Sequence, residues 1–241
     1  MIRTIAQAAR YIDRVGFCLL FPSKKLPLPS LIEASKGRAL RNYKPCADWS
    51  GDFVRLWRWK DELPRKRLAY YGKYFRGRGV FLSLEFLAYF YCLEGNPARL
   101  GAGDALERLY HEGKITTDAH AVCAALVKRG PQATLELRYG LGWEAKRGNR
   151  RFKRALLELQ QRLLIVHWGT KAETRAWESA VYQLTARAFP KAVRAAAKLT
   201  PDVARQRIAA RYRKYSPKAT PQEVARLFGW SRAEAQAALD S

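Results

Sequence analysis

The residues with the clearest chemical potential lie between positions 146 and 161, in a segment rich in cations and amides. They are Lys146, Arg147, Asn149, Arg150, Arg151, Lys153, Arg154 and Gln161. Guanidinium and ammonium groups bind phosphate oxygens, which gives affinity without sequence information. Asn and Gln side chains can pair with base edges. This set therefore indicates binding of a nucleic-acid backbone, with Asn149 and Gln161 as candidate base contacts.

The apolar residues of this segment recur at helical spacing and predict one long helix. They are Phe152, Ala155, Leu156, Leu159 and Leu163. Residues three and four apart share one face of a helix, so these side chains form a buried stripe and the cations occupy the opposite face. Asn149 stands where a helix N-cap is expected. Leu157 falls on the outward face, which suits either a base-stacking wedge or a contact between domains.

The elements around this helix follow the order of a winged helix. A helix is predicted over 117–128, a turn at 129–131, a short helix over 134–139, and then the basic helix. Two β-rich runs follow, LLIVHWG and ESAVYQLTA, separated by TKAETRAW. Lys171 and Arg175 would lie at the tip of this hairpin and contact DNA as the wing. A solvated amphipathic surface is the other interpretation of the basic helix, and binding is favoured because the charge coincides with a recognition position.

Composition indicates a globular protein with a polyanionic partner. The 241 residues contain 45 Lys and Arg against 21 Asp and Glu, a formal net charge of +24, and 48% hydrophobic residues. Such an excess of positive charge favours nucleic acid, although a basic proteome or an anionic membrane surface would also explain it. The four cysteines are scattered without a CxxC pair, and no Gly-rich phosphate loop is visible. We therefore expect no metal and no cofactor.

Three units are expected along the chain. Residues 1–100 would form an N-terminal winged-helix-like domain, residues 101–190 a central winged-helix domain, and residues 191–241 a helical unit of the helix-turn-helix type. In the first unit we expect a helix over 4–15, a strand over 17–21, a strand near 54–60 and a helix starting at Asp61. The predicted fold class is mainly α with small β-hairpins (α+β), built from tandem winged-helix domains. The chain lacks a membrane-spanning run, and we expect a cytoplasmic, nucleoid-associated monomer.

Several segments resemble one known family. They are YIDRVGFCLLF, WRWKDELP, RGPQATLELR, FKRALLELQQRLLIVHWG and YQLTARAFP. Together, over Tyr11 to Ala186, they resemble the winged-helix DNA glycosylases of the AlkZ/YcaQ type. The resemblance implies tandem winged helices, and an enzyme that excises alkylated bases or unhooks crosslinks.

The resemblance also implies candidate catalytic residues. The family carries a Gln-apolar-Gln or Gln-apolar-Asp triplet near its N-terminus, and the matching triplet here is Tyr11-Ile12-Asp13. Asp13 then occupies the second catalytic position, while Tyr11 replaces the first Gln. WRWKDELP departs from the family pattern after its tryptophans, and Asp61 is a candidate for the missing carboxylate, with a helix N-cap as its structural alternative. A carboxylate can stabilise the oxocarbenium-like state of glycosidic cleavage and polarise water.

The sequence therefore supports two leading functions. The first is a DNA repair glycosylase that hydrolyses the N-glycosidic bond of a damaged base in double-stranded DNA. The second is a non-enzymatic winged-helix DNA-binding protein, either a transcriptional regulator or an architectural factor. An RNA-binding protein shares the basic charge and would be favoured if single-stranded RNA competed better than duplex DNA.

Overall fold

The computed structural model describes residues 1–241 except 41, 49, 101–103 and 173–177. The N-terminal part contains α1 (Ile5–Val15), β1 (Phe17–Leu19), α2 (Leu31–Lys36), the 3-10 turn η1 (Pro45–Ala47), α3 (Gly51–Arg65), β2 (Tyr70–Gly72), the 3-10 turn η2 (Phe75–Gly77), β3 (Val80–Leu82) and α4 (Leu84–Leu93). The central part contains α5 (Ala105–His111), α6 (Thr117–Arg129), β4 (Gln132–Ala133), α7 (Thr134–Gly140), α8 (Lys146–Gln161), β5 (Ile165–Ala172), β6 (Glu178–Leu184) and α9 (Thr185–Ala188). The C-terminal part contains α10 (Pro190–Ala196), α11 (Pro201–Arg213), α12 (Pro221–Phe228) and α13 (Arg232–Asp240).

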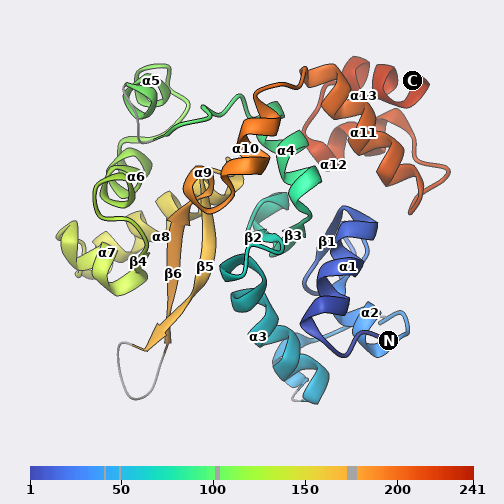
Figure 1. Ribbon diagram of the computed structural model, residues 1–241, viewed down its shortest axis with the longest axis horizontal. Helices are drawn as coiled ribbons and strands as arrows, with labels where there is room; N and C mark the ends of the chain where they lie inside the picture. The colour runs from blue at the N-terminus through green and yellow to red at the C-terminus, as the bar shows by residue number, and fades with distance from the viewer. Residues whose placement is uncertain (41, 49, 101–103, 173–177) are drawn as a thin grey trace.

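The described chain is mainly helical with small antiparallel sheets, as the α+β class predicts. One sheet has the strand order β1-β3-β2 and the other the order β4-β6-β5. The second sheet contains the expected hairpin of β5 and β6, which projects from the molecule beside α3 (Figure 1). None of the described helices has the length and apolar character needed to span a bilayer.

Local signals place many of these helices where the sequence predicts them. Thr4 and the Gln7 side chain form the capping box of α1, and the helix ends at Gly16. Gly16 has φ +82°, and a Cβ there would lie 2.7 Å from the ring of Phe86, so this turn requires glycine. Ser83 accepts a hydrogen bond from the backbone N–H of Phe86 and starts α4. These caps are short-range features, which explains why the sequence reveals them.

Three local predictions are wrong. The strand expected near 54–60 is part of one continuous helix, α3, which starts at the Ser50 cap and contains Asp61 in its interior. Asp61 is therefore not an N-cap. Asn149 is not an N-cap either, because α8 begins one turn earlier, after Ala145. Gly148 allows this earlier start, since a Cβ at that position would lie 2.6 Å from the Trp143 Cα.

The hydrophobic clusters show how the parts are joined. Residues between Leu100 and Leu184 form a cluster of their own, in which α6 packs against α8. The C-terminal helices share a cluster with the first sheet and α4, where Phe228 meets the rings of Phe17 and Phe90 at centroid distances of 5.9 and 6.0 Å. Figure 1 shows α10 and α11 next to α4. The division into units at residues 100 and 190 stays a prediction.

Candidate active site and nucleic-acid interface

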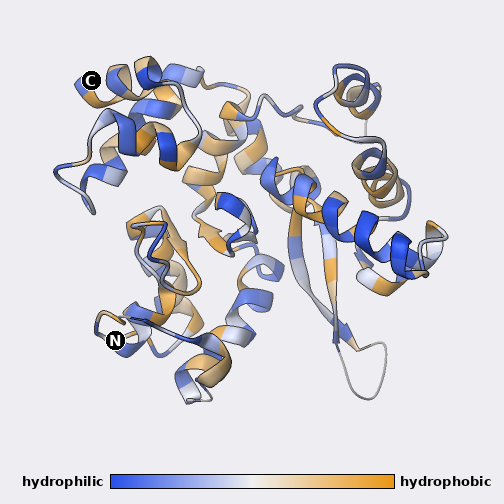
Figure 2. Cartoon of the chain, turned by 180° about the vertical axis from the view of Figure 1, so that it is seen from behind, coloured by the Kyte–Doolittle hydropathy of each residue, from blue (hydrophilic) through white to orange (hydrophobic). Residues whose placement is uncertain are grey.

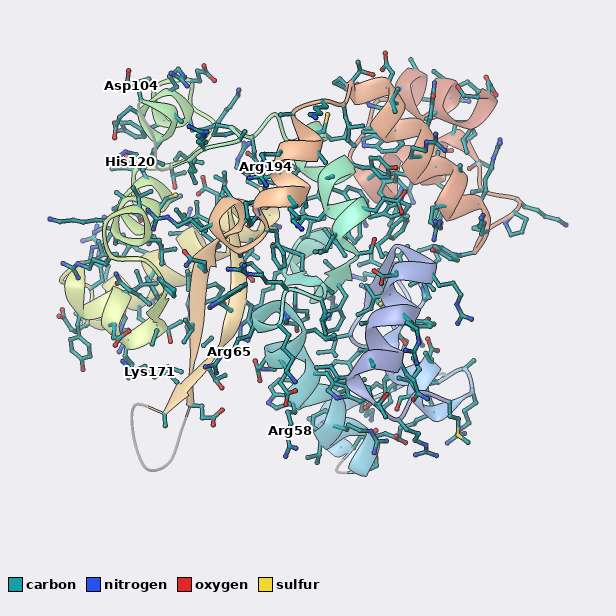
Figure 3. The ribbon with its side chains drawn as sticks, viewed as in Figure 1. Arg58, Arg65, Asp104, His120, Lys171 and Arg194 are labelled. Atoms are coloured by element: carbon teal, nitrogen blue, oxygen red, sulfur yellow. The ribbon has the colours of Figure 1, made fainter. Side chains whose placement is uncertain are left out.

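The third helix presents one polar face toward the β5–β6 hairpin. Its buried side carries Leu56, Trp59 and Leu63, which pack into the N-terminal core. The opposite side follows the same helical spacing and carries Val54, Trp57, Arg58, Asp61, Glu62 and Arg65. Because α3 packs against β5, this face lies beside the hairpin, where Figure 3 labels Arg58 and Arg65.

At the centre of this contact, Asp61 of α3 meets His167 of β5. The Asp61 Oδ1 atom is within hydrogen-bond reach of His167 Nε2, and Lys60 Nζ donates to the same oxygen at 2.7 Å. The His167 ring is buried between Tyr71 and Tyr182, whose rings meet it edge-on at centroid distances of 5.7 and 5.8 Å. Three residues from two distant segments therefore form one buried polar cluster.

The protonation of this cluster follows from burial and hydrogen bonding. Burial lowers the pKa of His167 below its ordinary value, and the opposing effect of the Asp61 carboxylate is smaller. Burial alone would raise the pKa of Asp61, but hydrogen bonds from His167 and Lys60 outweigh it, so the net pKa is lowered. The resulting state is a carboxylate with a neutral imidazole that donates Nε2–H and a lysine ammonium. Within the described part of the chain no group donates to Asp61 Oδ2, so this oxygen is available to a water or a substrate.

Asp61 faces a pocket between α3 and the hairpin. The pocket has a volume of about 420 Å³, and its wall on the hairpin side is formed by Gly169, Thr170 and Glu178. Strand pairing between β5 and β6 is irregular between His167 and Thr170, and Gly169 within this irregularity has φ +112°. A bulge of this kind bends a strand, and the absence of a side chain at Gly169 leaves space above Asp61.

The mouth of the pocket carries an exposed tryptophan. Trp57 is 49% exposed, although tryptophan residues are on average largely buried. Its ring stacks on Phe53 at a centroid distance of 5.8 Å, and Lys60 Nζ lies 4.5 Å from its centroid. Trp57 therefore contacts Phe53 and Lys60 at the edge of the site that contains Asp61.

The two candidates on α1 lie elsewhere. Tyr11 is half-buried and lines a separate pocket of about 470 Å³ with Arg14, whose guanidinium lies 5.5 Å from the Tyr11 ring centroid. Asp13 is exposed, and partial burial together with the charge of Glu85 raises its pKa. Residues two apart on a helix point to different sides, so Tyr11 and Asp13 do not share a pocket. The pockets lined by Tyr11 and Asp61 have no residue in common.

The predicted DNA-binding residues on α8 are largely solvent-exposed. Those with exposed side chains are Lys146, Arg147, Arg150, Arg151, Lys153, Arg154 and Gln161, while Asn149 is partly buried. α8 lies in front of the hairpin in Figure 2, where hydrophilic positions follow its length. Arg151 differs from the others because it bonds Asp118 at 2.6 Å and covers the Trp143 ring at 4.7 Å. Arg151 therefore has a structural role in holding α8 against α6.

The predicted DNA contacts of the hairpin, Lys171 and Arg175, and the outward-facing Leu157 lie in different surroundings. Lys171, labelled in Figure 3, lies near the end of β5 and forms an ion pair with Glu136 of α7. Arg175 lies outside the described residues. Leu157 contacts the η2 turn, where a Cβ on Gly77 would be 3.6 Å from Leu157 Cδ1, so it is a contact between the central and N-terminal parts.

Comparison with known proteins places the chain in a family. The model of the AlkZ-related family matches residues 2–229, nearly the whole chain. The protein belongs to the AlkZ-related family. Neither the curated proteins nor the solved structures contain a match to it. Family membership confirms the resemblance to the AlkZ/YcaQ type. It suggests a glycosylase-like role in which the protein interacts with DNA.

In this AlkZ-related protein, sequence reasoning missed two members of the polar cluster. His167 stands in a strand beside Trp168 and looks like a packing residue, and Lys60 looks like a charge on an alternating strand. The three- and four-residue spacing of Val54, Trp57, Asp61 and Arg65 fits a helix. This spacing is the signal that could have placed Lys60 and Asp61 on a helix. No local signal links His167 to Asp61, because 106 positions separate them.

Proposed function

We propose that this AlkZ-related protein is a DNA glycosylase that hydrolyses the N-glycosidic bond of an alkylated base, or of a crosslinked base that it unhooks. The observation that carries the proposal is the ionised Asp61 at the pocket between α3 and the hairpin, held by His167 and Lys60. Asp61 is the proposed catalytic carboxylate. Asp13 and Tyr11 remain the candidates that the family triplet supplies.

The chemistry fits the charge of the substrate. Alkylation at N7 of guanine makes the base cationic, so it leaves as a neutral molecule without needing a general acid. The sugar then develops oxocarbenium character, which an adjacent carboxylate stabilises. Asp61 Oδ2 would face this charge or orient the attacking water, while the two donors on Oδ1 keep the side chain ionised and fixed.

DNA binding in this proposal uses the central part as a winged helix. α8 would be the recognition helix, with Arg150, Lys153 and Arg154 at phosphates and Asn149 and Gln161 at base edges. The hairpin would be the wing. Because β5 carries both the wing and His167, a duplex held by α8 and the hairpin would lie next to the Asp61 pocket. A base leaving the stack would reach that pocket past Trp57.

The test measures release of free base from a 25-base-pair duplex with one N7-methylguanine under single-turnover conditions. The proposal predicts that the wild-type protein releases 7-methylguanine and leaves one abasic site that alkali cleaves. The unmodified duplex is the control for non-specific cleavage. Release from both duplexes, or strand cleavage without free base, would contradict the proposal.

A second function is favoured by a specific observation, the exposed cationic face of α8. Binding alone needs only this face and the hairpin, without the Asp61 pocket. Tight, salt-dependent binding to duplex DNA with no release of 7-methylguanine would therefore identify a non-enzymatic DNA-binding protein. Replacement of Arg150, Lys153 and Arg154 by Ala should weaken DNA binding under either function. This variant therefore tests the cationic face of α8 independently of the Asp61 pocket.

A further inference from the structure

A second concentration of positive charge lies in a pocket of the N-terminal part. Four cations line it, Lys24, Lys25, Lys44 and Arg78, and we name it the basic pocket. It has a volume of about 790 Å³, large enough for a phosphate group with its first waters. Ser23 and Asn42 add uncharged donors to the same wall. No carboxylate belongs to the described lining.

The cations of the basic pocket are not neutralised within the described part of the chain. Lys24, Lys25, Lys44 and Arg78 take part in none of its ion pairs, whereas Arg151 and Lys171 each have a carboxylate partner. Like charges held together repel one another, and an arrangement of this kind is relieved by a bound anion.

Two carboxylates bond residues of the wall, and the first is Glu33, which accepts from the backbone N–H of Leu40 at 2.9 Å. Tyr43, which lines the pocket, donates its hydroxyl to Asp48 at 2.7 Å. Asp48 also accepts from the Lys36 ammonium at 2.8 Å and from the backbone N–H of Ser50 at 2.9 Å. The Asp48 charge is balanced by Lys36, and Glu33 can offset only one of the four cations, so the wall keeps an excess of positive charge.

The basic pocket is connected to the exposed face of α8 through η2. Leu157 of α8 contacts Gly77 of η2, and Arg78 follows directly and lines the pocket. The neighbouring Arg76 is fixed by donating to the backbone carbonyl of Arg226 at 2.6 Å. The η2 turn therefore contacts α8 on one side and contributes the next residue, Arg78, to the basic pocket.

We propose that the basic pocket binds a backbone phosphate of the DNA strand that extends beyond α8, so that the protein holds its duplex at two separate places. This inference rests on the proposed DNA-binding function and deepens it. An Arg guanidinium and three ammonium groups suit a phosphodiester, which carries one negative charge and presents two unesterified oxygens. The contact would set the direction and length of DNA that the protein covers.

The experiment uses two duplex lengths and two matched variants of the full chain. α8 has 16 residues and is about 24 Å long, which corresponds to about 7 base pairs. On this proposal a duplex of about 8 base pairs is occupied by α8 alone, and one of about 25 base pairs extends to the basic pocket. The test variant replaces Lys24, Lys44 and Arg78 by Ala. The control replaces the exposed Lys191, Arg194 and Lys198 by Ala, an equal loss of charge around α10, which lies above the hairpin in Figure 3, where Arg194 is labelled.

Affinity is measured by fluorescence anisotropy over a salt series. The proposal predicts that the test variant loses about 1 from the slope of log K against log salt on the long duplex, because one phosphate is no longer neutralised, and about 8-fold in affinity near 0.1 M salt. It predicts no comparable loss on the short duplex, and little change for the control variant on either. Equal losses for both variants, or a loss on both lengths, would overturn it by showing an effect of net charge alone.

Two further outcomes separate the possible failures. Wild-type protein without measurable affinity for either duplex would overturn the proposed function together with this inference. Wild-type binding that the test variant reproduces on the long duplex would overturn this inference alone. Isothermal titration with inorganic phosphate identifies the source of the anion: saturable binding to the wild type, absent from the test variant and combined with unchanged DNA affinity, assigns the pocket to a free anion and also overturns it.

Discussion

Replacing Lys60 by Met tests the electrostatics of the Asp61 cluster. The Lys60 and Asp61 side chains are 9% and 17% exposed, so Lys60→Met leaves a largely buried carboxylate without its ammonium partner. Removing one member of a buried pair costs about 3–5 kcal/mol. Asp61 keeps the hydrogen bond with His167, and Met retains the packing of the stem over Trp57. We therefore expect a loss of about 2–3 kcal/mol in the free energy of unfolding at pH 7.

The same helix provides a matched control. Lys66 and Glu62 form an ion pair at 3.2 Å, but their side chains are 55% and 34% exposed. Lys66→Met should cost less than about 0.5 kcal/mol, since exposed pairs of this spacing contribute little. Urea denaturation followed by tryptophan fluorescence gives both values. Equal losses in the two variants would refute the description of the cluster as a buried, charge-balanced site.

The double variant sharpens this test. When Asp61→Asn is added to Lys60→Met, no lone charge remains in the cluster. The double variant should therefore be more stable than the sum of the two single losses predicts, by about 1 kcal/mol or more. Strict additivity would show that the two side chains do not interact in the folded protein.

Three further predictions concern pH and local packing. Because burial lowers the pKa of folded His167, the unfolded chain takes up more protons below about pH 6.5, and the free energy of unfolding should fall as the pH drops below that value. His167→Gln should reduce this fall between pH 7 and pH 5 in urea titrations. Gly148→Ala should destabilise the protein by about 1–3 kcal/mol despite the better helix propensity of Ala, because its Cβ would meet the Trp143 backbone, and a raised midpoint would contradict this contact. Thr220→Ala removes the capping box of α12 and should lower stability by about 1 kcal/mol, measured in the same way.

Features encoded over a few residues could be predicted from the sequence. The N-termini of α1, α4, α12 and α13 are fixed by capping groups within three residues of the first helical residue. The hairpin is evident from two β-rich runs with a polar interval. The amphipathic stripe of α8 is a property of spacing alone.

Features set by tertiary contacts could not be predicted in this way. The α3 segment mixes tryptophans and charges, which fits partial alternation as well as helical spacing, and its packing on both the N-terminal core and β5 decides for the helix. The Asp61–His167 contact depends on how α3 docks beside the hairpin, which no local pattern specifies. Joining of the C-terminal helices to α4 likewise comes from the shared aromatic cluster around Phe228.

The most direct test of the central claim is a comparison of Asp61→Asn with Asp13→Asn in the release of 7-methylguanine from duplex DNA under single-turnover conditions. The comparison uses equal protein, equal salt and saturating concentrations, which are set from each variant's measured DNA affinity. These conditions restrict it to the chemical step. The account predicts that Asp61→Asn abolishes release while DNA binding is retained, and that Asp13→Asn releases base at close to the wild-type rate. Loss of release in Asp13→Asn, with full activity in Asp61→Asn, would contradict the assignment and place the chemistry on α1.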